Sequence, residues 1–330
     1  MNSIQSSSIF DELNDWIHSY ANQGAIAVVC GKNGDMDTIG SAIALSSIHP
    51  NMMACGLHMN RLAKRLAIDL DAPFRTLSEH NTTWPNSISA VIVVDAAAEN
   101  QTGLSLPNVP KCIIDHHATN NWEIQQGDLL CQLDARSTTQ IVFEFLEQYH
   151  HQSLSIPVCK LLIAGLVTDT GRFKFADHGA FSAMDRILKH ANIDVQEFFE
   201  YIEQEDLTVS EQGVLLRGLN RTKIEQAGQW SLAMTRASTQ ESKIATMLRG
   251  LQTDVVLITR HRNGETRLTG RAQRNAVLDG VKLGSIMEEV AGRLGGEGGG
   301  HDGAAGWTGP CDTIAAETAF LDLLARVQRR

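Results

Sequence analysis

Acidic and histidine side chains stand at or shortly after the ends of three apolar runs in this 330-residue chain. The runs and their polar residues are 25–30 with Asp35 and Asp37, 90–95 with Asp95, and 111–115 with His116 and His117. Oxygen ligands with one or two imidazoles suit Mn²⁺ or Mg²⁺ better than a thiolate-preferring metal. Several carboxylates at close range cannot all stay ionised without cations between them. The pattern therefore predicts a divalent metal site, provided that the fold brings these segments together.

Each of these residues also has an ordinary structural explanation. Asp35 or Asp37 alone could cap the helix predicted at 38–48, because Asp is a favoured N-cap residue. Asp95 alone would more commonly be a turn residue at a strand end. The recurrence of such residues after several apolar runs favours the metal site. A further candidate ligand, Asp169, closes a very apolar helical stretch and precedes a glycine.

The hydrophobic pattern of the first half of the chain predicts a parallel α/β sheet. Short apolar runs, expected to be strands, alternate with helical patterns. The expected helices are 9–22, 38–48, 61–70, 138–149 and 158–167. Ligands of open parallel sheets bind outside the carboxyl ends of the strands, so the candidate residues would meet at one edge.

The pattern of the second half predicts a separate, smaller α/β domain. Strand patterns are absent from about 180 to 225 and return at 230–237, 254–261 and 266–272, before helices at 281–293 and 312–329. We therefore expect a catalytic metal-binding domain at 1–190, a helical linker at 191–225 and a C-terminal α/β domain at 226–330.

Glycines crowd residues 294–306, and His301 follows three of them in a row. Consecutive glycines can turn backbone N–H groups toward an anion without obstruction by side chains. Arg271 and Arg274 lie upstream, and a guanidinium suits a terminal phosphate or a carboxylate. The ordinary alternative is a flexible loop after the helix at 281–293, since glycine commonly ends helices.

Composition and charge limit the possible functions. With 43% hydrophobic and 20% charged residues, the chain resembles an ordinary soluble globular protein. It has no apolar run of the roughly 18 residues that a membrane span needs, and no secretory signal pattern at its start, so we expect a cytoplasmic protein. The net charge of −10 argues against broad binding to long nucleic acid, but not against a short anion held through metal ions. The six scattered cysteines indicate mostly buried thiols.

Taken in their order along the sequence, the motifs of this chain resemble those of the DHH phosphoesterase superfamily. The superfamily is named for the triplet that stands here as Asp115-His116-His117. The matching stretches are "NGDMDTIGSA", "VVDAAAE", "IIDHHATN" followed by "STTQIVFEFL", and "AGLVTDTGRF". The later stretch "GGGHDGAAG" is similar to the C-terminal domain of oligoribonuclease/pAp-phosphatase and RecJ-like members. The resemblance implies a parallel-sheet DHH catalytic domain and a smaller DHH-associated domain.

The resemblance also implies roles for individual residues. It assigns metal ligation to Asp35, Asp37, Asp95, His116 and Asp169, with two Mn²⁺ or Mg²⁺ ions bridged by Asp95. His117 would face the substrate phosphate, so that Asp95, His116 and His117 form the catalytic set. In the second domain, the substrate would be bound by Arg271, Gly299, Gly300 and His301. A homodimer is consistent with the resemblance.

The function expected from these motifs is two-metal phosphoester hydrolysis by water attack. The substrates would be short oligonucleotides, dinucleotides or 3′-phosphoadenosine 5′-phosphate (pAp), with no long duplex and no membrane as a partner. One alternative is a RecJ-like single-strand exonuclease, which the acidic balance and the lack of an added basic domain disfavour. Another is a non-catalytic nucleotide-binding or scaffolding protein. Inorganic pyrophosphatases share the DHH core but lack this glycine-rich second domain.

The first motif departs from the family pattern at its start. The family usually has a histidine four residues before the first aspartate, where this chain has Gly31, and a proline where it has Gly34. The ion beside Asp35 would therefore lack an imidazole ligand. Water, Asn33 or a side chain from elsewhere could replace it, or that ion would bind weakly. Alternatively, the backbone itself needs glycine at position 31, with a positive φ at the strand exit.

Overall fold

The apolar runs of the first half form a parallel six-stranded sheet. The computed structural model describes residues 3–79, 82–204 and 207–330. The strand order of the first sheet is β3-β2-β1-β4-β5-β6, and all its pairs are parallel. The strands are β1 Ala25–Cys30, β2 Met52–Gly56, β3 Arg75–Thr76, β4 Ile88–Val94, β5 Lys111–Asp115 and β6 Leu129–Gln132.

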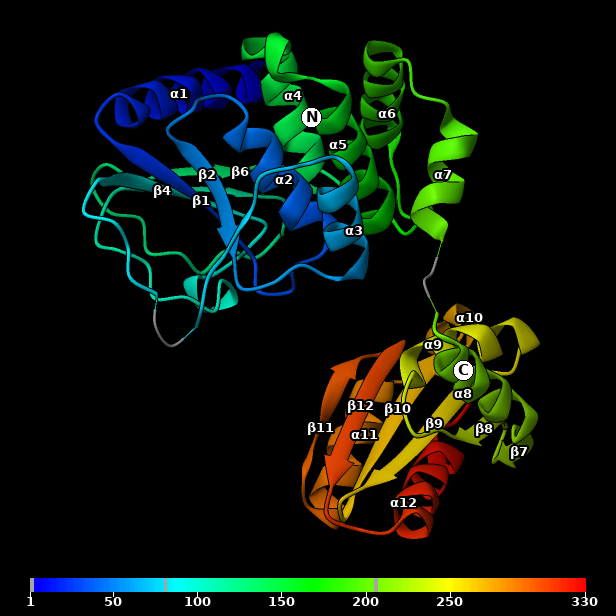
Figure 1. Cartoon of the computed structure of the whole chain (residues 1–330). Coiled ribbons are helices and arrows are strands. Elements are labelled where there is room, and N and C mark those ends of the chain that lie inside the picture. The colour runs from blue at the N-terminus through cyan, green and yellow to red at the C-terminus, as the bar shows by residue number, and fades with distance from the viewer. Residues whose placement is uncertain (1–2, 80–81, 205–206) are drawn as a thin grey trace. The chain divides into compact units, whose positions relative to one another are not determined.

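Helices cover one face of this sheet. The helices of this unit are α1 Ser3–Ala21, α2 Met36–Ser46, α3 Arg61–Asp69, α4 Thr138–Tyr149, α5 Ile156–Asp169, α6 His178–Ala191 and α7 Val195–Glu203. Figure 1 shows α1, α2, α4 and α5 on one side of the strands. Alternate residues of β1, such as Ile26 and Val28, pack into the core under these helices. Val29 faces a smaller core closed by side chains of irregular segments, including Trp84 and Trp122.

The predicted α/β class and parallel first sheet are confirmed. The strands expected at 25–30 and 111–115 have those bounds, and β4 ends one residue before Asp95. The short strands β2, β3 and β6 were not expected. Short 3₁₀ helices lie at Glu99–Gln101, His151–Ser153 and Arg249–Leu251.

A second, mixed six-stranded sheet forms the C-terminal half, in the order β11-β12-β10-β9-β8-β7. Its strands are β7 Lys223–Ala227, β8 Trp230–Arg236, β9 Val255–Arg262, β10 Glu265–Ala272, β11 Glu297–His301 and β12 Ala304–Gly309. Its helices are α8 Val209–Asn220, α9 Glu241–Leu248, α10 Arg274–Leu278, α11 Leu283–Leu294 and α12 Thr313–Arg326. Among the described residues of this second sheet, only β8 and β9 pair in parallel, and the other pairs are antiparallel.

The two halves are separate compact units, Met1–Gln204 and Glu205–Arg330. The helical stretch expected as a linker, 191–225, contains α7 and α8, and the division falls between these two helices. Each unit has its own sheet and its own buried core.

The glycine-rich stretch forms a hairpin of β11 and β12, so the alternative of a flexible loop is wrong. Close packing of α11 on β11 explains several of its glycines. A Cβ on Gly298 would overlap the carbonyl of Met287 in α11, and a Cβ on Gly284 in α11 would overlap the carbonyl of Gly300. The helix and the strand thus approach each other through glycines on both sides.

Five of the six cysteines are buried and all six are free thiols, as the sequence predicts. Within the described ranges 3–79, 82–204 and 207–330, no helix combines the length and apolar character that crossing a bilayer requires.

Candidate active site

The loop after β1 presents Asp35 as the cap of helix α2. Gly34 turns the chain with a φ of 58°, and a side chain there would overlap the carbonyl of His58. One carboxylate oxygen of Asp35, Oδ1, accepts hydrogen bonds from the backbone N–H groups of Asp37 and Thr38 at 3.1 and 3.2 Å. Oδ2 accepts from the Asn33 amide at 2.7 Å. The capping alternative therefore applies to Asp35.

Asp37, in contrast, caps helix α4, whose first N–H groups belong to residues 101 and 102 positions further along the chain. Its side chain is 1% exposed. Oδ2 accepts from Thr138 N at 2.7 Å, and Oδ1 accepts from Thr139 N and Oγ1 at 2.8 and 2.6 Å. Since helix N-termini favour negative charge, the start of α4 is a suitable partner for this carboxylate and holds it in a fixed orientation.

Asp95 follows β4 in an uncommon backbone conformation. Its φ is 57°, although it has a side chain, and it is 6% exposed. Its N–H still donates to Ile114 O of β5 at 3.0 Å, which fixes it to the sheet. Thr138 Oγ1 donates to its Oδ1 at 3.3 Å. Strained residues of this kind occur preferentially at functional sites, so this finding supports a role for Asp95.

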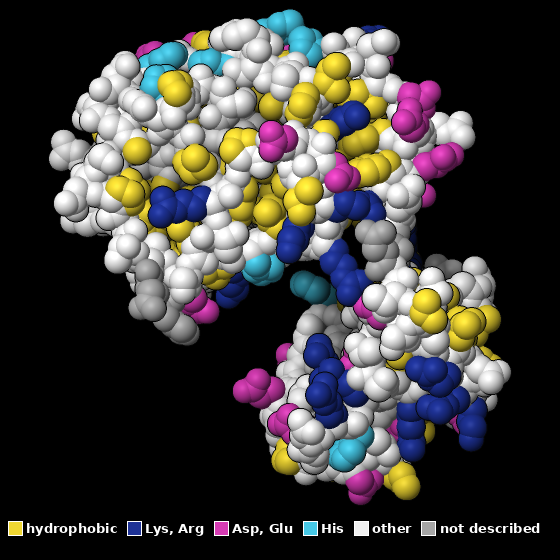
Figure 2. All heavy atoms as spheres, in the orientation of Figure 1, with side chains coloured by type: hydrophobic (Ala, Val, Ile, Leu, Met, Phe, Trp, Pro, Cys, Tyr) yellow, Lys and Arg dark blue, Asp and Glu magenta, His cyan; other side chains and the backbone are white. Residues whose placement is uncertain are grey.

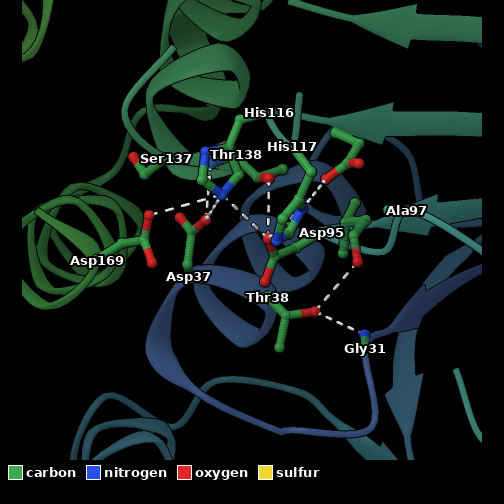
Figure 3. Close-up of polar contacts among 12 residues, drawn as sticks. Gly31, Asp37, Thr38, Asp95, Ala97, His116, His117, Ser137, Thr138 and Asp169 are labelled. Carbon is green, nitrogen blue, oxygen red and sulfur yellow. Dashed lines mark hydrogen bonds and ion pairs between the residues drawn. The ribbon is translucent and has the colours of Figure 1, made fainter. Parts of the chain in front are cut away.

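The imidazole of His116 lies among three carboxylates (Figure 3). Its Nε2 is 3.8 Å from Asp37 Oδ2, 3.5 Å from Asp95 Oδ1 and 3.6 Å from Asp169 Oδ2. Asp169 is the last residue of α5. Four segments that are distant in the sequence therefore meet at the carboxyl ends of β1, β4 and β5.

The next imidazole, His117, is oriented by a buried acid. Its Nδ1 is 2.6 Å from Asp115 Oδ1 and 3.9 Å from Asp95 Oδ1. Asp115 is fully buried, whereas the His117 side chain is 44% exposed. Asp115 therefore fixes the ring while its outer edge stays accessible.

Two groups of possible ligand atoms share His116. In each group, one atom per residue lies within 4.8 Å of the others: Asp37, His116 and Asp169 in the first, and Asp95, His116 and His117 in the second. Among the described residues, Asp35 belongs to neither group. The structure thus brings together four of the five predicted ligands and leaves Asp35 as a helix cap beside them.

The electrostatics of this site favour a positive charge at its centre. Burial and the charge of Asp37 raise the pKa of Asp95 to about 7, and the same two causes raise the pKa of Asp169 to about 6. Burial alone would lower the pKa of His116, but its contact with Asp95 and the charge of Asp37 outweigh burial and raise it to about 9. Without a bound cation, a proton on His116 therefore balances part of the negative charge.

The surroundings of Gly31, and not its φ, disfavour a side chain at this position. Gly31 is not among the glycines with positive φ, so the alternative of a positive φ at this position is wrong. A Cβ would instead lie 2.9 Å from the backbone carbonyl oxygen of Asp95 and 3.1 Å from Asn33 Oδ1. Its N–H donates to Thr38 Oγ1 at 2.8 Å, and Thr38 Oγ1 donates to Val94 O at 3.2 Å. Gly31 thus allows the exits of β1 and β4 to approach each other.

Sequence reasoning missed the residues that hold the site in place: Thr38, Asp115, Thr138 and Thr139. The signals were present. Asp115 stands at the end of a buried strand beside two histidines, and "STTQ" combines an N-cap serine with two further hydroxyls at a helix start. Neither pattern predicts which residues these side chains contact in the fold.

The predicted substrate-binding residues of the second unit lie near one end of its glycine hairpin. Arg271 of β10 pairs in register with Ala304 of β12, and Ala304 pairs with His301 of β11. Gly299 pairs with Gly306, and Gly300 with Ala305. Arg271 and His301 therefore stand in one row across three strands.

Comparison with known families identifies both units. Residues 25–166 match the model of the DHH family, N-terminal domain, and residues 234–329 match that of the DHHA1 domain. The chain belongs to the DHH phosphoesterase superfamily, with a DHH domain followed by a DHHA1 domain. The resemblance stated from the motifs is confirmed.

Two individual proteins illustrate the relationship. An uncharacterized protein of Methanocaldococcus jannaschii, MJ0988, is 25% identical over 313 residues, which cover 89% of each chain. The crystal structure of an exopolyphosphatase-related protein from Bacteroides fragilis superposes with a TM-score of 0.74 over 96% of each chain, at 14% sequence identity. At this identity, the likeness shows a shared fold.

Proposed function

We propose that this protein hydrolyses phosphate esters of short nucleotides with Mn²⁺ or Mg²⁺ held at the strand ends of its DHH domain. One observation carries the proposal. His116 Nε2 lies 3.5–3.8 Å from carboxylates of Asp37, Asp95 and Asp169, which come from three other segments of the chain. Apolar side chains would commonly serve packing at least as well, so such a set of acids around one imidazole favours a functional role.

The side chains present fit a divalent cation. Three carboxylates and an imidazole are donors that suit Mn²⁺ or Mg²⁺, and the raised pKa values of Asp95 and Asp169 reflect negative charge that a cation would relieve. Asp37, Asp95, His116 and Asp169 would hold the metal, with Asp95 between two ions. When bound, such ions polarise a phosphoryl oxygen and lower the pKa of water.

The surrounding residues keep these ligands in position. The first turn of α4 fixes Asp37 through Thr138 and Thr139, and the β4–β5 pairing fixes Asp95. Because Asp115 occupies Nδ1 of His117, Nε2 is the ring atom left to contact a phosphate oxygen. The hydrogen bond with Asp115 raises the pKa of His117, which favours the imidazolium as the donor.

In the proposed site, Asp35 is a less available metal ligand than the other four residues. Its carboxylate belongs to the cap of α2, and burial raises its pKa. As a ligand it would have to share an oxygen that already accepts hydrogen bonds from backbone N–H groups or from Asn33.

The DHHA1 unit is proposed to bind the nucleotide, through Arg271, Gly299, Gly300 and His301. The proposed substrates are dinucleotides, oligonucleotides of up to about five residues, or pAp, since the acidic chain offers no long basic track of the kind that extended single strands need. Of the predicted glycines, Gly300 is also needed for packing, because a Cβ there would lie 2.7 Å from Ala304 O.

A substrate panel tests the proposal. The protein with Mn²⁺ is incubated with 5′-phosphorylated oligoribonucleotides of two to about 25 residues, pAp and a short polyphosphate, and released mononucleotide and phosphate are quantified. We expect the fastest turnover on dimers to pentamers. Equal rates on dimers and 25-mers would favour a RecJ-like exonuclease. Polyphosphate is included because an exopolyphosphatase-related protein shares the fold. The absence of any hydrolysis would favour a non-catalytic nucleotide-binding protein.

A further inference from the structure

Two arginines of the second unit lie close together without an acidic partner. Arg249 follows the last residue of α9, and Gln273 Nε2 donates to its carbonyl at 2.6 Å, which ties this helix end to the chain just after Arg271. Arg249 Nε is inaccessible to solvent and has no hydrogen-bond partner. Arg271 Nη1 donates to Gly270 O at 3.3 Å, and within the described residues neither arginine forms an ion pair.

The two side chains share one face of the second sheet. Arg271 of β10 is opposite Val256 of β9 in an antiparallel pair, so their side chains project to the same face. Helix α9 packs on that face, since Ile244 and Leu248 share a buried cluster with Val256. The end of α9, which carries Arg249, therefore lies on the side of the sheet to which Arg271 points.

The two positive charges of Arg249 and Arg271, close together on one face of the sheet, need a negative counter-charge. Burial and the charge of Arg249 both lower the pKa of Arg271. The chain as a whole has 28 Lys and Arg against 38 Asp and Glu, yet in residues 207–330 the cations outnumber the acids. Figure 2 shows groups of Lys and Arg side chains on the visible face of this unit. The acidic balance of the chain therefore belongs to the DHH unit, and the DHHA1 unit is suited to an anion.

We infer that Arg249 is an anion-binding residue that, with Arg271 and His301, takes the terminal phosphate monoester of the substrate. The inference rests on the proposed function, because it names the end of the nucleotide that the DHHA1 unit selects. A monoester carries nearly two negative charges at neutral pH, whereas an internal diester carries one. Two guanidiniums match the monoester in both charge and geometry. Arg249 thus makes the site selective for a phosphorylated terminus.

Binding without metal tests this inference independently of hydrolysis. The full chain is titrated calorimetrically in EDTA with the dinucleotides pApA and ApA, which differ only in the terminal phosphate. We expect pApA to bind at least about tenfold more tightly than ApA, the effect of one or two charge-assisted hydrogen bonds. We expect Arg249→Gln to weaken pApA binding about tenfold and ApA binding less than about twofold. Arg249→Lys should lose only part of the affinity for pApA, because lysine keeps the positive charge but lacks the planar guanidinium.

Arg262→Gln is the matched control. Arg262 is an exposed arginine at the far end of β9, and its loss changes the net charge by the same amount. It should leave the preference for pApA unchanged. The inference is overturned if wild-type protein binds the two dinucleotides equally, or if Arg249→Gln binds pApA within twofold of wild type. The wild-type comparison needs no variant to fold. A retained preference for pApA without hydrolysis in Mn²⁺ would reject the proposed function alone.

Discussion

Each unit of this chain contains a conspicuous sequence pattern: acids and histidines in the DHH unit, and a run of glycines in the DHHA1 unit. The structure uses these two patterns in different ways. At the strand ends of the DHH unit, three acids from distant segments lie 3.5–3.8 Å from the imidazole of His116, and backbone groups of other elements hold Asp37 and Asp95. In the DHHA1 unit, several glycines of the conspicuous run allow a helix to lie close against a strand. Charged residues brought together in a buried place need a functional reason, whereas glycines can serve packing alone.

The largest expected effect concerns Asp95 in the candidate metal site of the DHH unit. Asp95→Asn should reduce hydrolysis to less than a tenth of the wild-type rate, which is more than about 1.4 kcal/mol of barrier. Asn tolerates the left-handed backbone of position 95, so the fold should persist. The measurement is initial rate with Mn²⁺, beside a circular dichroism melt. Asp185→Asn, an exposed change on α6, is the control. A variant at position 95 that keeps more than a tenth of the rate would remove Asp95 from the centre of the site.

The second prediction tests the packing role of glycine with the same substitution at two positions of one helix. Gly284→Ala should destabilise the DHHA1 unit by about 1–3 kcal/mol, because its Cβ would overlap the carbonyl of Gly300. Gly292→Ala, also in α11, meets no atom within 4 Å and should stabilise by about 0.5–1 kcal/mol. Urea unfolding of both variants decides the matter. Equal effects would mean that α11 does not depend on its close approach to β11.

The third prediction separates the two aspartates of the first motif. Asp37→Asn should lower the free energy of unfolding by about 1–3 kcal/mol, since an amide N–H would face the N–H groups at the start of α4. Asp35→Asn should change it by less than about 0.5 kcal/mol, because Asn is an equally good N-cap. Both are measured in EDTA, so that metal binding does not contribute. A larger loss for Asp35→Asn would reverse the assignment of the two roles.

The smallest expected effect concerns Gly31. Gly31→His should lower stability by about 1 kcal/mol, because its Cβ would lie 2.9 Å from the Asp95 carbonyl. It should leave Mn²⁺ affinity nearly unchanged. Calorimetric titration of Mn²⁺ beside a thermal melt measures both. Tighter binding of one ion would show that the position can accept the imidazole that the resemblance implies.

The sequence predicted the parallel sheet and most of the site because both depend on local patterns. The run "AIAVVC" is apolar throughout, as a strand buried on both faces must be, and parallel topology then forces the residues after such strands to one edge. The partner of Asp37 could not be predicted, since its hydrogen bonds to Thr138 and Thr139 depend on where α4 begins in space. The hairpin of β11 was missed because glycine has low strand propensity, and only contact with α11 explains it.

The most direct test of the central claim is the position of bound metal. Crystals of the full chain grown with Mn²⁺ are measured at the manganese absorption edge, where anomalous scattering locates the ions. We predict two peaks about 3.5–4 Å apart, both within ligand distance of Asp95, with Asp37, His116 and Asp169 completing the set. The absence of any peak among these four side chains at saturating Mn²⁺ would contradict the account.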